Sequence, residues 1–539
     1  MGKIFDTLFH RRKTEIFYER DMAPDRSRKL YKDIDENIRI FNEYLADCDD
    51  LISREFVVGN PGGPKHRMAL FNIDGLVDKR LVHEEIMKSL MLFARQVPLE
   101  YSVGDKFFQL VKDGLLTVAE VREIDNFGEA VLAVLSGDTA LFIDKLDRGL
   151  ILNTRGWEKR SVQEPATEAV IRGPREGFTE TYRVNVALVR RRIKDPNLKV
   201  QTIRLGRHTR TDVGVLYIKG IANPSIVEEV LKRLNSIDTS GVLESGYIEQ
   251  MIEDNWLSFF PQFRRTERPD VAAASLMEGN VLIICDNTPF ALIAPTTFYS
   301  LFQSPEDYYE RWYIASLIRI LRMTAAFLAA TAPALYVAMI SFHPGMLPTD
   351  LALSIGATRE GVPFTTTVEA LIMMLALEVL REAGIRLPGP IGQTIGIVGG
   401  LVVGEAAVRA GIVSPIMVIL IAINAISSFA IPNFSLAVAF RLLAFIFLFL
   451  ASVAGLYGLI LGYLGLTIHL VTLKSFGSNY LSPLVSFKMK KAWDIFVRPP
   501  LPSIKERPDY TKPLDRERMR DLRQDQEGRG GDENADGRR

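Results

Sequence analysis

The stretch LLAFIFLFLASVAGLYGLILGYLGLTIHLVTL, residues 442–473, contains no charged side chain when histidine is counted as neutral. As one helix, its 32 residues would be about 48 Å long, whereas the hydrocarbon core of a bilayer is about 30 Å thick. The segment therefore predicts a membrane crossing that is longer than one simple span needs. Four glycines offer places for a tilt, a break or a re-entrant turn: Gly455, Gly458, Gly462 and Gly465.

Three more uncharged runs precede this stretch, at 323–349, 387–404 and 410–440. Each reaches or approaches the roughly 20 apolar residues that a spanning helix needs. A further candidate, 362–380, is interrupted by Glu369 and Glu378. We expect about five spans, with four as the alternative if 362–380 does not cross. The expected spans lie near 323–342, 362–380, 388–408, 412–432 and 442–470.

The apolar stretch NVLIICDNTPFALIAPTTF, residues 280–298, has a different character. Asp286, Pro289 and Pro295 divide it into short pieces rich in valine and isoleucine. An unpaired carboxylate and a broken helix are both poorly accommodated in lipid. We therefore predict two buried strands around an Asn-Thr-Pro turn, outside the membrane.

The order of strand and helix signals before residue 311 predicts the fold class. We expect an α+β (α/β-type) soluble part with two subdomains, then an α-helical transmembrane bundle, then a disordered charged tail. Beyond about residue 502 the chain has few apolar residues to bury, so we expect this tail to be dispensable for the fold. The expected divisions are a polar extension at 1–50, subdomains at 51–155 and 156–310, a transmembrane domain at 311–473, and a C-terminal segment with the tail at 474–539.

Charge and cysteine content give few indications of a partner or a compartment. Lys+Arg and Asp+Glu number 65 each, and two cysteines provide no disulfide framework. The N-terminus lacks an apolar core of signal-peptide length, and Arg311, Arg319 and Arg322 precede the first span. These features predict a cytoplasmic N-terminal half. The basic segment 172–210 lacks stacking aromatics and predicts a solvated face, or one near anionic lipid, rather than a nucleic-acid site.

Motifs for catalysis or cofactor binding are missing from the sequence. There is no P-loop and no dinucleotide-binding GxGxxG, and HEEIM at 83–87 lacks the second histidine of a zinc helix. The six histidines are scattered along the chain. We therefore expect no enzymatic activity, no cofactor and no bound metal.

Several longer phrases resemble the GerA family, over about residues 30–500 and including the membrane segments. They are IRGPREGFTE (171–180), NVALVRRRIKDPNL (185–198), TDVGVLYIKGIANP (211–224), ESGYIEQMIED (244–254), RTERPDVAAASLMEGNVLIICDNTPF (265–290) and REGVPFTTTVEALIMMLALEVLREAGIRLP (359–388).

The resemblance implies the A subunit of a nutrient germinant receptor in the inner membrane of a bacterial spore, with its N-terminal half facing the spore core. It also implies two partners, a transporter-like B subunit and a lipoprotein C subunit. The A subunit would be a homo-oligomer that releases ions when the nutrient signal arrives, and a pentameric ring is one arrangement. A related spore-membrane paralogue in ion release is an alternative.

The segment GQTIGIVGGLVVGEAAVRAG, residues 392–411, supplies the first candidate site. Its glycines occupy one helical face, where another helix could approach closely, at Gly392, Gly396, Gly400 and Gly404. Glu405 lies on a different stripe, together with Thr394, Val398 and Leu401. Two interpretations remain open: Glu405 pairs with Arg409 at the membrane interface, or the stripe faces a pore or subunit seam and favours cations.

Polar residues in two other expected spans supply the remaining candidates. Glu369 shares a helical face with Thr365, Thr366, Met373 and Ala376. Glu369 is either a hydrogen-bonded group at a helix end or a pore group, and Asn424 is favoured as a hydrogen-bonding group between helices over a pore group. At the level of function, an ion-conducting, signal-gated oligomer is favoured over a membrane scaffold that only docks a receptor partner.

Overall fold

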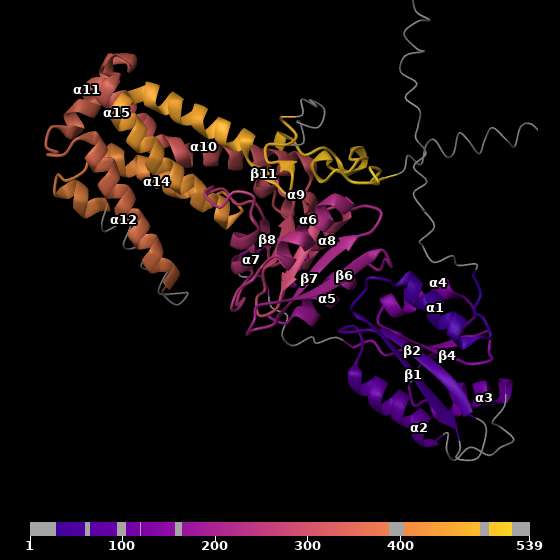
Figure 1. The fold of residues 1–539 in the computed structure, drawn as a ribbon. Coiled ribbons are helices and arrows are strands. Elements are labelled where there is room, and N and C mark those ends of the chain that lie inside the picture. The colour runs from indigo at the N-terminus through magenta and orange to yellow at the C-terminus, as the bar shows by residue number, and fades with distance from the viewer. Residues whose placement is uncertain are drawn as a thin grey trace, which may run out of the picture.

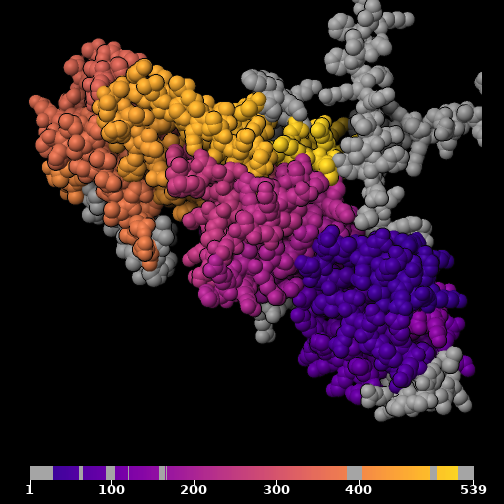
Figure 2. All heavy atoms as spheres, in the orientation of Figure 1, coloured from indigo at the N-terminus to yellow at the C-terminus, as the bar shows by residue number. Residues whose placement is uncertain are grey.

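The computed structural model describes residues 28–59, 65–93, 104–118, 120–156, 164–165, 167–386, 404–485 and 495–519. These residues form a first subdomain, a second subdomain and a helical domain, which run from indigo through magenta to orange in Figure 1. The expectation of an α+β part followed by a helical part is confirmed. The C-terminal residues, in yellow, return to the second subdomain (Figure 2).

The first subdomain is a five-stranded antiparallel sheet with helices on both faces and the strand order β1-β2-β4-β5-β3. Because successive side chains of a strand face opposite sides, Phe71 and Phe142 join one buried cluster while Leu70 and Leu141 join another. The strands are β1 (Leu51–Gly59), β2 (Lys65–Ile73), β3 (Val121–Ile124), β4 (Thr139–Ile143) and β5 (Gly149–Leu152). One face carries α1 (Ile34–Tyr44) and α4 (Phe127–Leu135). The other carries α2 (Ser89–Phe93), α3 (Asp105–Leu110) and two short π-helices, η2 (Leu81–Lys88) and η5 (Val111–Leu115).

The second subdomain is also a five-stranded antiparallel sheet between helices, with the order β6-β7-β9-β10-β8. Its strands are β6 (Leu198–Leu205), β7 (Thr211–Ile218), β8 (Arg264–Thr266), β9 (Val281–Cys285) and β10 (Ala291–Ala294). The helices α5 (Tyr182–Arg190) and α8 (Pro269–Met277) cover one face, and α6 (Pro224–Asn235) and α7 (Ser245–Ile252) cover the other.

The two subdomains share one topology. Numbered within each sheet, the strand order is the same, first-second-fourth-fifth-third. A helix precedes the first strand in each (α1 or α5), and a helix on that same face lies between the third and fourth strands (α4 or α8). The soluble part therefore consists of two successive copies of one arrangement, which the sequence does not display as a repeat of fixed period.

A buried ion pair joins these two copies. In this pair, Nε and Nη2 of Arg190 each lie 2.8 Å from one carboxylate oxygen of Asp50. Both side chains are buried. The backbone of Cys48 bridges that of Val200 beside the pair. Since a buried guanidinium without its counterion is strongly unfavourable, the ion pair fixes the end of α5 against the first subdomain, and the bridge does the same for the start of β6.

The stretch 280–298 forms β9 and β10, as predicted. The two strands pair antiparallel, with Val281 opposite Ala294 and Ile284 opposite Ala291. Every residue of both strands is buried. Asp286 lies in the turn between them, where its carboxylate accepts a hydrogen bond from the backbone N–H of Tyr182.

The helical domain follows a short connection. Its longer helices, in the part of the chain that the structure describes, are α10 (Trp312–Phe342), α11 (Thr349–Arg359), α12 (Thr366–Arg386), α14 (Pro415–Phe429) and α15 (Phe434–Thr472). Among the described residues, α10 and α15 are long and apolar enough to cross a membrane, and α14 is a shorter apolar helix. Most of the expected span at 388–408 lies outside the described residues.

Helix α15 reverses direction at Gly455, one of the four glycines that offered a place for a tilt, a break or a re-entrant turn. Gly455 has φ 59° and ψ −139°, a conformation that glycine adopts without steric cost. Beyond it the chain runs back along itself, so that the rings of Phe447 and Tyr463 lie 4.7 Å apart. Both ends of α15 lie near the second subdomain: Phe440 packs against Phe298, and His469 Nε2 is 2.9 Å from Ser258 Oγ.

The C-terminal segment differs from its predicted disorder after about residue 502. Residues 501–519 pack on the second subdomain, where the backbone N–H of Leu514 donates to the carbonyl of Ile221. Thr511 is buried and donates to the carbonyl of Glu278 at 2.9 Å, and Tyr510 Oη lies 3.4 Å from Asn280 Oδ1. A few anchoring residues suffice to order a segment whose composition is mostly charged. Residues 520–539 lie outside the described residues.

This packing predicts a difference between two truncated chains. A chain that ends at residue 500 is expected to unfold with a free energy about 3 kcal/mol lower than one that ends at 519, because it loses these hydrogen bonds and buried surface. Thermal unfolding of both purified chains in the same detergent measures the difference. Equal melting temperatures would show that the segment is dispensable, as the composition alone suggests.

Candidate functional site

A fully buried carboxylate, Glu369, lies where three helices of the helical domain meet. Its Oε1 accepts hydrogen bonds from the backbone N–H and the hydroxyl of Ser414, at 2.6 and 2.5 Å. Ser414 is the N-cap of α14, so the carboxylate sits at the positive end of that helix dipole. Arg359 at the end of α11 completes the site, with Nη2 3.5 Å from Oε2 of Glu369.

The surrounding residues show which face of α12 points inward. Thr366 is buried and bonds to Arg359 Nη1, and Met373 is buried among α10 and α14. Thr365 is exposed to the outside of the chain. Thr366 and Met373 are thus buried like Glu369, whereas Thr365 is not, and Arg359 contacts both Glu369 and Thr366. The two partners of Glu369, Ser414 and Arg359, were not predicted from the sequence.

A second charged cluster lies at the other end of α12. Glu378 lies between two arginines, with Oε1 3.1 Å from Arg381 and Oε2 3.3 Å from Arg441 of α15. Arg381 also donates to the hydroxyl of Ser428 at the end of α14. Ionisable groups among membrane helices are expensive unless paired, and these pairs allow α12 to carry the acids that interrupt its apolar sequence.

The other candidate residues have simpler surroundings. Asn424 is buried and donates through Nδ2 to the carbonyl of Ala329 in α10, at 2.6 Å, which is the geometry of a hydrogen bond between helices. Glu405 pairs with Arg409 at 2.6 Å, and both side chains are largely exposed. Gly404 faces Val418 of α14. The other residues of the glycine face and of the stripe that contains Glu405 lie outside the described residues: Gly392, Thr394, Gly396, Val398, Gly400 and Leu401.

A buried acid links the second subdomain to the first long helix. Asp307 of α9 (Glu306–Tyr309) accepts hydrogen bonds from Arg319 Nε at 3.0 Å and from Arg322 Nη1 at 2.8 Å. Asp307 and Arg319 are both buried. In the sequence these arginines indicate only orientation, because no local pattern relates them to an acid that lies twelve residues before Arg319 and fifteen before Arg322.

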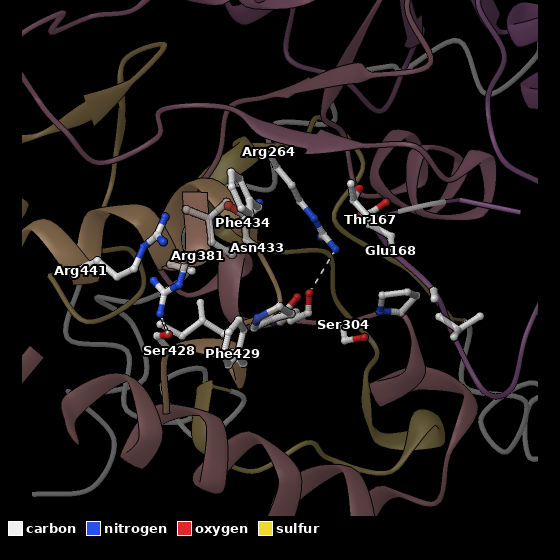
Figure 3. A pocket seen from close by; sticks show the side chains of 18 residues that line it. Thr167, Glu168, Arg264, Ser304, Arg381, Ser428, Phe429, Asn433, Phe434 and Arg441 are labelled. Carbon is white, nitrogen blue, oxygen red and sulfur yellow. Dashed lines mark hydrogen bonds between the residues drawn. The ribbon is translucent and has the colours of Figure 1, made fainter. Parts of the chain in front are cut away.

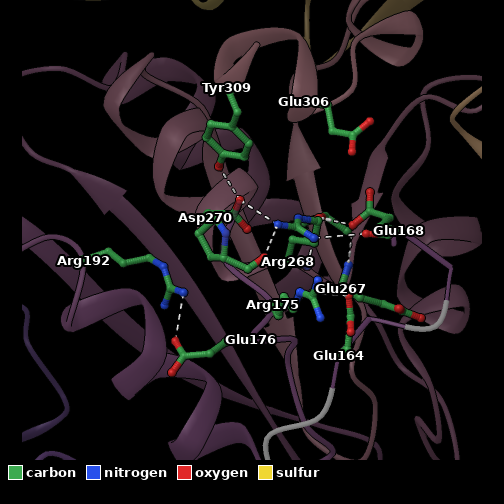
Figure 4. A network of polar contacts seen from close by, with 12 residues as sticks. Glu164, Glu168, Arg175, Glu176, Arg192, Glu267, Arg268, Asp270, Glu306 and Tyr309 are labelled. Carbon is green, nitrogen blue, oxygen red and sulfur yellow. Dashed lines mark hydrogen bonds and ion pairs between the residues drawn. The ribbon is translucent and has the colours of Figure 1, made fainter. Parts of the chain in front are cut away.

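A polar network that contacts Tyr309 of α9 ties the segment before α5 to the same junction (Figure 4). Arg268 is completely buried and donates to the carbonyl groups of Glu168 and Pro174 and to the carboxylate of Asp270. Asp270 also accepts a hydrogen bond from the hydroxyl of Tyr309. Burial raises the pKa of Glu168 above its ordinary value. A displacement of the second subdomain would therefore move α9, and with it the start of α10.

A pH dependence is expected from Glu253, at the end of α7. Burial, reinforced by the neighbouring charge of Glu249, raises the pKa of Glu253 from 4.5 to about 7. Between these values the unfolded chain binds fewer protons than the folded chain, so the free energy of unfolding falls as pH rises. We expect Glu253→Gln to remove this decline between pH 5 and 7 and to raise the melting temperature at pH 8.

Thermal scans of the full chain in detergent at several pH values test this expectation. Glu228→Gln serves as the control, because Glu228 is an exposed acid on α6 of the same subdomain. An unchanged pH slope in Glu253→Gln, or an equal change in both variants, would contradict the assignment.

Taken together, the apolar helices and the α+β part define a membrane protein with a large extramembrane region at its N-terminal end. The sequence profile of the GerA family, described as Bacillus/Clostridium GerA spore germination protein, matches residues 39–510. The chain belongs to this family, whose members include A subunits of spore germinant receptors.

Individual relatives agree over most of their length. Spore germination protein GerLA of Bacillus cereus is 45% identical over 480 residues, which cover 89% of this chain and 96% of that protein. Spore germination protein KA of Bacillus subtilis (strain 168) is 43% identical over 484 residues, which cover 90% of this chain and 88% of that protein. The crystal structure of the N-terminal domain of the A subunit of the Bacillus megaterium germinant receptor GerK3 is 34% identical, covers 50% of this chain and 97% of that one, and has a TM-score of 0.40.

Proposed function

We propose that this A subunit oligomerises in the inner membrane of the spore and forms a nutrient-gated ion channel with a transporter-like B subunit and a lipoprotein C subunit. The observation that carries the proposal is the set of ionisable side chains between apolar helices, in the Glu369 and Glu378 clusters. Such groups are rare in membrane helices and commonly belong to ion pathways or to switches. A nucleic-acid partner is not part of the proposal.

The same proposal includes a topology with the soluble part on the cytoplasmic side. The start of α10 contacts α9 and residue Arg498, and the end of α15 contacts Ser258, so both lie beside the second subdomain. An even number of crossings then separates them, as in the alternative of four spans and unlike the favoured five. With this topology Arg322, Arg441 and Lys474 all lie on the cytoplasmic side, in agreement with the positive-inside rule.

Ion flux from liposomes tests the channel. The purified full chain is reconstituted with and without its B and C partners, and release of potassium is followed after a germinant is added. Glu405→Gln is expected to lower cation flux if the stripe that contains Glu405 faces the pore. Glu382→Gln is the matched control, because Glu382 forms an equally exposed pair with Arg386, also at 2.6 Å and four residues apart.

A membrane scaffold is the second candidate function, and one observation favours it. Glu369 and Asn424, two of the candidate pore groups, are both engaged in contacts between helices. A scaffold would assemble with the B and C subunits and support germination in the spore, but liposomes that contain the assembled complex would release no ions.

Ion flux that is equal in the wild type, Glu405→Gln and Glu382→Gln would still support a channel, but it would show that Glu405 does not line the pore.

A further inference from the structure

A cavity of about 500 Å³ lies where the second subdomain meets the helical domain. The subdomain contributes Thr167, Glu168 and Arg264 to its wall, and the ends of α12, α14 and α15 contribute Arg381, Phe429 and Arg441, among others. Figure 3 shows Arg381 and Arg441 side by side on one side of the cavity, with Thr167 and Glu168 on the opposite side. With the topology proposed above, the cavity lies where the ends of α12, α14 and α15 leave the bilayer.

The charges around this cavity favour an anion. Glu378 is shared by Arg381 and Arg441, so one positive charge of this cluster is not neutralised within it. Among the described residues, the buried Nε of Arg381 has no hydrogen-bond partner. Arg264 adds a further guanidinium, which donates to the carbonyl of Gln303 at 3.3 Å. The acid in the wall, Glu168, has a pKa raised by burial and accepts hydrogen bonds from Thr266 and the backbone of Glu267.

The remaining wall is apolar and continues to the outer surface of the helices. Leu301, Ile431 and Ala437 line the cavity. Phe429 at the end of α14 and Phe434 at the start of α15 also line it, yet they are 74% and 63% exposed. These phenylalanine rings are apolar, and at the ends of membrane helices lipid acyl chains can cover them and remove their surface from water. The site thus combines arginine donors with an apolar path toward the bilayer.

We propose that this cavity binds one anionic phospholipid, whose phosphate contacts Arg381 and Arg441 and whose acyl chains leave past Phe429 and Phe434. Guanidinium groups match the geometry of phosphate oxygens, and basic pockets between membrane helices on the cytoplasmic side are suited to lipid headgroups. A free phosphate would satisfy the arginines but leave the apolar wall in contact with water. The proposal rests on the membrane topology given above, and it does not require that the protein conducts ions.

Such a lipid would connect two parts of the molecule that must act together. Its headgroup would touch the second subdomain and the ends of α12, α14 and α15 at the same time. A movement of the subdomain relative to these helices would open or close the cavity. The composition of the cytoplasmic leaflet would then influence how readily the subdomain transmits a signal to the helices.

The test measures which lipid remains bound to the purified full chain. The protein in detergent is incubated with vesicles of phosphatidylcholine, with or without phosphatidylglycerol, and is then analysed by native mass spectrometry. We expect one phosphatidylglycerol to be retained in preference to phosphatidylcholine, and Arg381→Gln to lower its retention about tenfold, as expected for one charge-assisted hydrogen bond. Arg386→Gln, which removes an exposed arginine from the same helix outside the cavity, is expected to retain the lipid.

A second variant keeps the proposal testable if Arg381→Gln fails to fold. Ala437→Phe fills the apolar wall and keeps all three arginines, and it too is expected to lose the lipid. Equal retention in Arg381→Gln and Arg386→Gln, or equal retention of the two lipids, would overturn the proposal. Inorganic phosphate alone forms a separate arm: if it raises the melting temperature as much as phosphatidylglycerol, with the same dependence on Arg381, the site binds a free oxyanion and not a lipid.

Discussion

Gly455→Ala is expected to prevent the protein from accumulating in the membrane in a folded form, whereas Gly465→Ala is expected to be tolerated. The added methyl group at position 455 would lie 2.8 Å from Cβ of Phe342 and 3.0 Å from Nε2 of His343. It would also place an L side chain at φ +59° with ψ −139°. Strain and overpacking together cost about 3 kcal/mol, and the reversal of α15 depends on this one residue.

The control differs only in its surroundings. A methyl group at Gly465 would meet no atom within 4 Å, and alanine favours a helix by up to about 1 kcal/mol relative to glycine. Fluorescence-detected size-exclusion chromatography of both variants, expressed at the same level, measures folded protein directly. A normal, monodisperse Gly455→Ala would mean that α15 does not turn at this residue.

The sequence predicted the parts of the fold that depend on local pattern. The apolar runs indicated the helical domain, and Asp286 with its neighbouring prolines indicated two strands at 280–298, now β9 and β10. The four glycines of 442–473 indicated a break but not its place. Gly455 is distinguished from Gly465 by its contacts with Phe342, the last residue of α10, and with His343, which follows it. A distant contact of this kind leaves no pattern in one sequence.

The same limit explains why the partners of the candidate site were missed. Glu378 interrupts an apolar run, which led us to treat 362–380 as marginal, yet one of its two arginines lies 63 residues along the chain in α15. Ser414, which binds Glu369, lies 45 residues away. The repeated topology of the two subdomains was hidden for a related reason, because strand order depends on pairing and not on spacing.

Glu369→Gln is expected to lower the free energy of unfolding by about 3 kcal/mol, since it leaves Arg359 without its counterion in the interior. The side chain of Arg359 is 15% exposed and that of Glu369 is 0% exposed. Glu405→Gln removes a carboxylate from a pair that is 55% and 79% exposed. Surface pairs of this kind contribute about 0–1 kcal/mol, so the control is expected to melt close to the wild type.

A double variant separates the ion pair from the carboxylate itself. Arg359→Leu combined with Glu369→Leu removes both charges and is expected to be more stable than Glu369→Leu alone, because no unpaired charge remains buried. Thermal unfolding in detergent gives all of these values, and ion flux from liposomes is measured on the same samples. A Glu369→Gln protein with an unchanged melting temperature but an altered ion selectivity would mean that this carboxylate faces a conducting path and does not hold α11, α12 and α14 together.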